Sequence, residues 1–212
     1  MAKRVKVVRE TSESVITVIL DRETRDPAAK TKLRTPLPFF NHMLEHVQWR
    51  SQTNLTVDVA LDHFDLAHLV TEDVGITLGR AFKEYVEVNM ELGIVGYGHA
   101  YGTIDEALTR AVVSFENRAY LDFQTGAVTL PEAVEGMHSE DLVAFFEGFV
   151  QGAACTLHLD LIKGRPGHGH HIWEATFRAL GMALFEALSP RAWREGMTAG
   201  VAGGITMRVE AT

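Results

Sequence analysis

The sequence predicts an α+β fold built by tandem duplication of a small unit, in which a four-stranded sheet is backed by two helices. Two observations lead to this prediction. Segments that alternate apolar and polar residues, typical of half-buried strands, are interleaved with segments of helical periodicity. In addition, two long stretches of the chain match each other without a gap.

The individual elements follow from the pattern of apolar residues. Residues 6–21 and 102–123 are rich in strand-forming residues, and residues 55–61 alternate like a half-buried strand. Residues 38–49 form an amphipathic helix that begins with a proline, which the first helical turn tolerates. A second helix is predicted over residues 69–86, where apolar residues recur at helical spacing: Val70, Val74, Leu78 and Phe82.

The repeat joins a strand to the helix that follows it. An offset of 102 residues carries the matched parts of 55–86 onto those of 157–188, including His68 onto His170. Upstream, a Phe-Phe pair at 39–40 resembles another at 145–146, at a slightly different offset.

We expect the two units to meet at a Gly-rich link near residues 90–95. The prediction therefore assigns residues 1–92 to the first αβ repeat and residues 93–212 to the second. The glycines of this link are Gly93, Gly96 and Gly98.

Composition bounds the class of protein. The chain has 212 residues, 46% of them hydrophobic, which is enough for a full core. Its net charge of -8 argues against non-specific nucleic-acid binding, although a local group of Arg residues could still bind an anionic substrate. Cys155 is the single cysteine, which excludes an internal disulfide and a thiolate metal cluster. With no signal core or bilayer-length apolar stretch, we expect a cytoplasmic protein with no membrane partner.

Histidine and glutamate indicate the chemistry. The repeat places H-x-x-x-E at the start of a helix twice, as His68/Glu72 and His170/Glu174. Residues four apart lie on one helical face, so an imidazole and a carboxylate can bind one cation together. One such pair is a common accident, but its recurrence at equivalent positions predicts a site for Mn, Fe, Co, Ni or Zn.

Further histidines accompany these pairs. His171 lies about 100° further round the helix than its neighbour and could serve a second metal ion. His158 lies on the preceding strand and His42 in the helix over 38–49, whereas His46 and His168 are candidates to support metal ligands. Three others are expected at the surface: His63, His99 and His138.

The same motifs resemble those of the imidazoleglycerol-phosphate dehydratase family over nearly the whole chain. PFFNHML resembles P-F-[FL]-D-H-M-L, and AHLVTEDVGITLG resembles D-H-H-T-x-E-D-V-x-x-x-L-G. GTIDEAL, NRAYL and RETSES resemble three further family elements, P-x-D-E-A-L, G-R-P-Y-L and R-x-T-x-E-T. The resemblance implies a duplicated αβ fold and a lyase that removes water from imidazole glycerol phosphate, giving imidazole acetol phosphate in histidine biosynthesis.

The resemblance also implies a cofactor, an assembly and residue roles. It implies two Mn(II) ions, with Zn(II) or another divalent transition metal as the alternative, bound between the subunits of a 24-mer that acts on an azole substrate. The implied metal ligands are His42, His68, Glu72, His158, His170, His171 and Glu174. The implied catalytic residues are Glu13, Glu72, Glu174 and His171, with Glu13 as general-base candidate. The implied substrate contacts are Glu13, Arg118 and Arg178.

Some positions around the implied metal ions depart from the family pattern. Leu69 replaces the second His of the first H-H pair, so we expect one metal ion to bind more weakly unless water, His46 or His63 substitutes. Asn41 replaces an Asp, which removes a carboxylate beside a ligand. Arg50–Ser51 replaces a segment that contains His in the family.

Other departures affect the implied phosphate site. Gly96 stands where the family has Arg, and Arg178 where it has Lys, while Arg118 is retained. Residues 201–204 or their neighbours stand where the family has S-T-K-G. Two alternatives to the dehydratase therefore stay open: a related metal-dependent lyase for an azole without phosphate, and a catalytically idle metal-binding shell protein.

Overall fold

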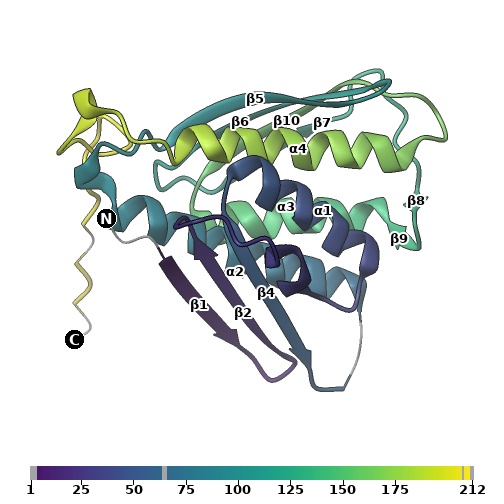
Figure 1. Ribbon diagram of the computed structural model, residues 1–212, viewed down its shortest axis with the longest axis horizontal. Helices are drawn as coiled ribbons and strands as arrows, with labels where there is room; N and C mark the ends of the chain where they lie inside the picture. Colours follow the sequence, from purple (N-terminus) through teal and green to yellow (C-terminus); the bar gives the residue numbers. More distant parts are fainter. Residues whose placement is uncertain (1–3, 64–65, 207, 211–212) are drawn as a thin grey trace.

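The molecule consists of two four-stranded sheets on the outside with four helices between them (Figure 1). The structure, a computed structural model, describes residues 4–63, 66–206 and 208–210. Each sheet is backed by two helices of its own unit, and the helices of the two units meet in the middle of the molecule. This arrangement confirms the predicted α+β class and the duplicated unit.

The first sheet has the strand order β1-β2-β4-β3. Its first three strands in that order are antiparallel, and the short β3 runs parallel to β4 after the one-turn helix η1 (Ala29–Lys32). Alternate residues of β2 are fully buried against the helices, as the alternating sequence predicts. The bounds are β1 (Arg4–Glu10), β2 (Ser14–Asp21), β3 (Leu33–Arg34) and β4 (Asn54–Leu61).

The second sheet repeats this topology in the order β5-β6-β10-β7, again with its last strand parallel to its neighbour. Its strands are β5 (Tyr97–Ile104), β6 (Ala107–Ser114), β7 (Tyr120–Gln124) and β10 (Thr156–Lys163). The second unit also contains a small hairpin, β8 (Ala133–Val134) and β9 (Met137–His138), that the repeat did not predict.

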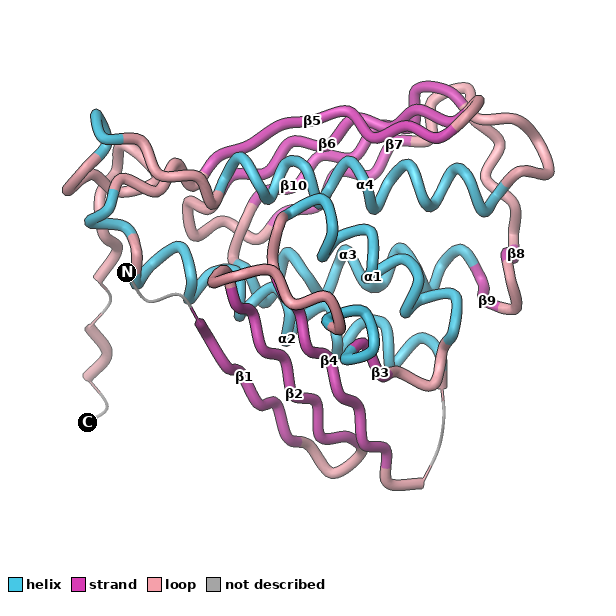
Figure 2. Tube along the Cα trace, in the orientation of Figure 1, coloured by secondary structure: helices cyan, strands magenta, loops and turns pink. Residues whose placement is uncertain are grey.

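The helices pair across the two units rather than within them. The first helix, α1 (Pro38–Ser51), packs on α4 (Gly169–Ala187), and α2 (Ala67–Val88) packs on α3 (Ser139–Ala153). Figure 2 shows α3 and α4 beginning at the same end of the molecule, next to β9. Two single turns, η2 (Met90–Leu92) and η3 (Ala192–Arg194), complete the described elements.

Glycines allow α2 and α3 to approach until their backbones touch. A Cβ atom on Gly75 would lie 2.3 Å from the carbonyl oxygen of Phe145, and one on Gly79 would lie 2.1 Å from that of Phe149. The contacts advance in the same direction along both helices, so the pair is parallel. The same holds for α1 and α4, where Gly181 faces the end of α1 and the ring of His170 faces that of His42.

The structure corrects one detail of the repeat. Both α1 and α3 end on a left-handed residue, Gln52 with φ 55° and Ala154 with φ 47°, and these two positions share the offset of 102. The Phe-Phe pairs at 39–40 and 145–146 are therefore not structurally equivalent. Instead, Phe40 and Phe145 pack edge to face in the core, with ring centroids 5.3 Å apart.

One hydrophobic cluster runs through both units and joins them into a single body. We propose that the units divide between residues 92 and 93, after η2 and before β5. None of the helices in the described part of the chain combines the length and apolarity required to cross a bilayer.

Candidate metal centre

The strongest candidate site lies between α1 and α4. His42 on α1 and His170 and Glu174 on α4 bring their ligand atoms within 4.8 Å of one another. The Nε2 atom of His170 lies 3.4 Å from Glu174 Oε2, and that of His42 lies 3.8 Å from the same oxygen. Metal–ligand bonds of about 2.0–2.2 Å place neighbouring donors about 3–3.5 Å apart, so this group fits a transition-metal ion after small adjustments.

Carboxylates lie beside the opposite ring nitrogens of these histidines, within hydrogen-bond distance for His170 only. His170 Nδ1 lies 3.1 Å from Oε1 of Glu135, and His42 Nδ1 lies 3.8 Å from Oε2 of Glu45. In metal sites, such a carboxylate fixes the tautomer of the ring and leaves the other nitrogen for the metal ion. Glu135 belongs to the β8–β9 turn, and no pattern in the sequence identified it.

Glu174 is the buried charge of this site, with a side chain only 6% exposed. Arg178, one turn further along α4, forms an ion pair with it and also donates a hydrogen bond to the carbonyl oxygen of Thr103 at 2.9 Å. A buried carboxylate needs such a partner because its desolvation is costly. Arg178 is therefore engaged with a metal-ligand candidate, and the structure does not bring it beside Arg118.

A further histidine, His46, adjoins the group. Its Nε2 atom lies 3.3 Å from Glu174 Oε1 and 3.4 Å from His42 Nε2. Burial lowers the pKa of the His46 imidazole to about 4, an effect that the charge of Glu174 only partly opposes. The ring is thus neutral at physiological pH, which is the form that binds metal ions.

A second group of possible ligands lies at the start of α4. Glu106, His168 and His171 have ligand atoms within 4.8 Å of one another. Oε1 of Glu106 lies 2.9 Å from His168 Nδ1 and 3.0 Å from His171 Nδ1, so one carboxylate oxygen orients both rings. The pKa of the Glu106 carboxyl is lowered, mainly by a backbone hydrogen bond and to a smaller extent by the hydrogen bond and charge of His171. Glu106 belongs to the recognised GTIDEAL segment, which was the available signal for it.

The repeat-related pair on α2 has a more open setting. His68 Nε2 lies 3.8 Å from Glu72 Oε2, and His68 Nδ1 lies 3.8 Å from Oδ1 of Asp141 on α3. The side chains of His68 and Glu72 are 61% and 39% exposed. The position of α3 equivalent to His42 is Ala144, so α3 provides no second imidazole beside His68 at this position.

The other implied ligands and catalytic residues lie apart from these groups within one chain. His158 is on β10, 3.2 Å from Asp122 of the neighbouring strand. Glu13 is exposed in the β1–β2 turn, where its carbonyl oxygen accepts a hydrogen bond from Asp62. Figure 1 places this turn at the bottom of the first sheet, away from α4.

The positions that depart from the family pattern have structural explanations in two cases. The Asn41 side chain accepts a hydrogen bond from the backbone of Thr35 and donates one back, each 3.0 Å long. A carboxylate could not do both, so the amide fixes the entry to α1. Gly96 has φ 67°, and a Cβ atom there would lie 2.6 Å from Ala199 Cβ, which leaves no room for an arginine without rearrangement.

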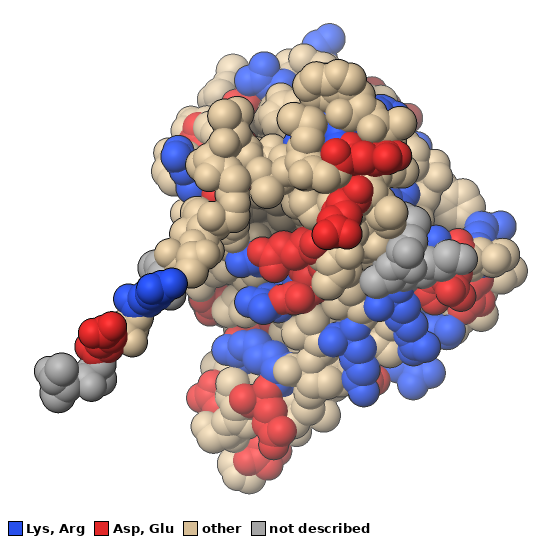
Figure 3. Space-filling view, turned by 90° about the vertical axis from the view of Figure 1, so that its left-hand side faces the viewer, with Lys and Arg blue, Asp and Glu red and all other residues tan. Residues whose placement is uncertain are grey.

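Some of the residues implied to bind phosphate line a small cavity of about 300 Å³ beside the C-terminal segment, but Gly96 and Arg178 are not in its lining. Arg118 and Lys83 line it, together with Glu87 and Glu116 and with residues 202–204. Figure 3 shows the side of the molecule that carries the C-terminal segment, where acidic side chains cross the middle and basic ones gather below them. The negative net charge is therefore unevenly spread.

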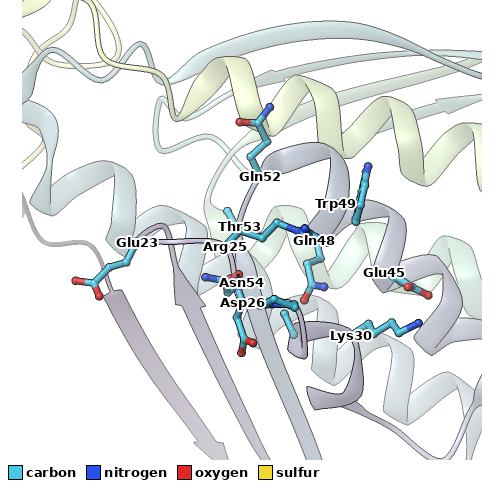
Figure 4. Close-up of a pocket in the computed structure, with 12 residues that line it drawn as sticks. Glu23, Arg25, Asp26, Lys30, Glu45, Gln48, Trp49, Gln52, Thr53 and Asn54 are labelled. Carbon is cyan, nitrogen blue, oxygen red and sulfur yellow. Dashed lines mark hydrogen bonds between the residues drawn. The ribbon is translucent and has the colours of Figure 1, made fainter.

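A larger cavity, about 590 Å³, lies on the other side of α1 and is shown in Figure 4. Trp49 and Gln48 of α1 line it together with Arg25, whose guanidinium carbon lies 5.1 Å from the centre of the Trp49 ring. Glu45 lines the cavity and also contacts His42. Neither of the two metal-ligand groups found among the described residues lies in its lining.

The three histidines expected at the surface are exposed. His63 pairs with Asp62 at 3.0 Å and His99 with Glu186 at 3.2 Å, while His138 precedes α3 and its backbone amide donates a hydrogen bond to Asp141. Leu69 lies half-buried in the first turn of α2.

Comparison with known proteins gives a consistent result. A family model described as imidazoleglycerol-phosphate dehydratase matches residues 35–184. The chain is 41% identical over 196 residues to an imidazoleglycerol-phosphate dehydratase of Ralstonia pickettii (strain 12J), covering 91% of this chain and 94% of that one. It is 39% identical over 208 residues to the enzyme of that name from Thioalkalivibrio sulfidiphilus (strain HL-EbGR7), covering 97% and 100%.

Solved structures agree with this result. The chain superposes with a TM-score of 0.76 on IGPD from Pyrococcus furiosus in complex with (S)-C348, at 28% identity, covering 94% of this chain and 100% of that one. It superposes with a TM-score of 0.71 on the imidazoleglycerol-phosphate dehydratase of Staphylococcus aureus subsp. aureus N315, at 30% identity, covering 89% and 99%.

Proposed function

The chain belongs to the imidazoleglycerol-phosphate dehydratase family, and from this premise we propose how its residues divide the reaction. The protein is a hydro-lyase of histidine biosynthesis that removes water from imidazoleglycerol phosphate. The observation that carries the assignment of the site is the meeting of His42, His170 and Glu174 between α1 and α4. All three are among the metal ligands that the family resemblance implies.

We propose that this group holds one divalent metal ion, Mn(II) in the first place and Zn(II) as the alternative. Two imidazoles with one carboxylate suit such ions better than Mg(II) or Ca(II). When bound, the ion supplies Lewis-acid polarisation and a template for the azole ring. The chain itself supplies the orientation of His170, through Glu135 on its outer ring nitrogen.

A second ion would use residues that one chain holds apart. We propose that His171, His68, Glu72 and His158 complete this site across a contact between subunits. Their exposure supports the proposal, since His68 and His158 have side chains 61% and 44% exposed and free to meet another chain. The assembly proposed from the family resemblance is a 24-mer, and light scattering of the metal-loaded protein tests it.

Two carboxylates are available for proton transfer. Dehydration moves a C–H proton to a base and supplies a proton to the departing hydroxyl group. We propose Glu13 as the base, reaching the site of a neighbouring chain from its exposed turn, since its own α4 is distant. Glu72, 39% exposed and proposed as a ligand of the second ion, is the carboxylate that would deliver the second proton to the departing hydroxyl group.

One observation favours a second candidate, a lyase for an azole without phosphate. The cavity beside Arg118 is lined by as many acidic as basic side chains. At Gly96 even a Cβ atom would lie 2.6 Å from Ala199 Cβ, so the arginine of the family does not fit there without rearrangement. Charge-assisted hydrogen bonds contribute about 1.5–3 kcal/mol each, so losing two of them would weaken phosphate binding a hundredfold or more.

Measurement of kcat/KM for imidazole glycerol with and without the phosphate separates these candidates. The family function predicts a kcat/KM of about 10⁴ M⁻¹s⁻¹ or above for the phosphorylated compound. A preference for the unphosphorylated compound would support the second candidate. Tight metal binding with no turnover of either compound would identify an idle shell protein.

A further inference from the structure

The first turns of α1 carry a second pair of histidines at helical spacing. His42 and His46 lie four residues apart on α1, opposite His170 and Glu174, which lie four residues apart on α4. Two histidines at this spacing on one helical face form a recognised metal-binding arrangement. Because α1 and α4 run parallel, the two pairs lie side by side. His42 faces His170, and one helical turn further along both helices His46 faces Glu174.

His46 adjoins two of the three members of the His42, His170 and Glu174 group, at distances close to those between ligands of one metal ion, while Arg178 also pairs with Glu174. His46 Nε2 lies 3.4 Å from His42 Nε2, which lies 3.8 Å from Glu174 Oε2. Both oxygens of Glu174 face imidazole nitrogens, Oε1 towards His46 at 3.3 Å and Oε2 towards His170 at 3.4 Å. Donors bound to a common ion at about 2.0–2.2 Å have this spacing.

His46 also has the environment of a ligand rather than of a surface residue. Its side chain is 16% exposed, whereas that of His63, the other substitute considered from the sequence, is 78% exposed. His63 pairs with Asp62 in the loop after β4, where neither residue contacts the α1–α4 group. Of the two histidines considered as substitute ligands, the geometry therefore favours His46 over His63.

We propose that His46 is an additional ligand of the metal ion held by His42, His170 and Glu174. This inference rests on the proposed metal-dependent function. The site then has three imidazoles and one carboxylate, all from α1 and α4 of one chain. The simpler role for His46 would be a hydrogen bond to His42 without metal coordination. The experiment distinguishes this role from that of a metal ligand.

The test is a titration of the chelator-treated full-length protein with Mn(II). Calorimetry measures the affinity for the ion, and pulsed electron paramagnetic resonance counts the coordinated nitrogens. Wild type is compared with His46→Ala, with His46→Gln, which keeps a hydrogen-bonding side chain, and with the matched control His63→Ala. Circular dichroism establishes that each variant is folded. If His46→Ala is unfolded, His46→Gln provides the comparison.

The proposal predicts that both His46 variants bind the ion at least about tenfold more weakly and lose one coordinated nitrogen, while His63→Ala binds like wild type. Unchanged affinity, or weaker binding with an unchanged nitrogen count, would overturn it and leave His46 as a hydrogen-bonding neighbour. Failure of the wild type to bind any Mn(II) or Zn(II) would instead contradict the proposed function.

Discussion

The Nε2 atom of His170 lies 3.4 Å from the Oε2 atom of Glu174, one turn further along α4. The equivalent atoms of His68 and Glu72 lie 3.8 Å apart on α2, so duplication has kept the same relationship in both units. The surroundings differ, because the Glu174 side chain is buried among imidazoles whereas that of Glu72 is 39% exposed. The pair on α4 therefore belongs to a group of three possible ligands with His42, whereas the pair on α2 provides only His68 and Glu72.

Replacement of His170 by alanine should reduce metal binding at least about tenfold, since it removes one imidazole from the α1–α4 group. Elemental analysis after dialysis against Mn(II) measures the occupancy. His99→Ala is the matched control, because His99 is exposed and lies outside both ligand groups. Equal occupancy in both variants would exclude His170 as a ligand.

Chelator-treated protein should lose stability as the pH falls from 6.5 towards 4, because of His46. Burial holds the pKa of the folded-state imidazole at about 4, compared with 6.5 in the unfolded chain. Well above pH 6.5 this imidazole is neutral in both states. Below it the unfolded state alone gains a proton, so unfolding becomes easier by up to about 3 kcal/mol at pH 4.

Urea unfolding of the metal-free protein at pH 7 and pH 5 measures this effect. His46→Gln should show a smaller loss of unfolding free energy over the same interval. A loss as large as that of wild type would assign the pH dependence to other groups.

Gly75→Ala should destabilise the protein by about 1–3 kcal/mol, since the new Cβ atom would lie 2.3 Å from the Phe145 carbonyl oxygen. The two parallel helices would have to separate. Gly204→Ala provides the control, because a Cβ atom there meets nothing within 4 Å. Thermal unfolding of the two variants should differ by several degrees, and equal melting temperatures would contradict the close packing of α2 on α3.

Cys155 should not react with iodoacetamide in the native protein at pH 8. Burial at the start of β10 raises the pKa of its thiol to about 12, so almost no thiolate is present. After unfolding in denaturant, one equivalent should react, as mass spectrometry will show. Rapid labelling of the native protein would indicate that this part of the core opens readily.

Much of the fold could be predicted from the sequence because strands and helices differ in the period of their apolar residues. The offset of 102 also identified α2 and α4 as equivalents. The short β3 and the β8–β9 hairpin could not be predicted, because two residues are too few to show a period. The pairing of α1 with α4 across the units depends on tertiary packing around Gly181, which a local pattern does not contain.

The candidate site was predicted in part. The H-x-x-x-E pairs identified His170 and Glu174, and the family motif identified His42. The roles of Glu106, Glu135 and Asp141 could not be predicted, because these carboxylates reach histidines from distant parts of the chain. The sequence named His46 as a possible supporting residue or substitute ligand beside His63, and only the packing of α1 on α4 places it next to Glu174.

The central claim is that this chain is a metal-dependent dehydratase, and a turnover assay tests it most directly. Chelator-treated protein is incubated with imidazoleglycerol phosphate, with and without added Mn(II), and formation of imidazole acetol phosphate is followed. The account predicts turnover that is lost on chelation and restored by Mn(II). Turnover that persists without any metal ion, or no turnover when the protein is fully loaded with Mn(II), would contradict it.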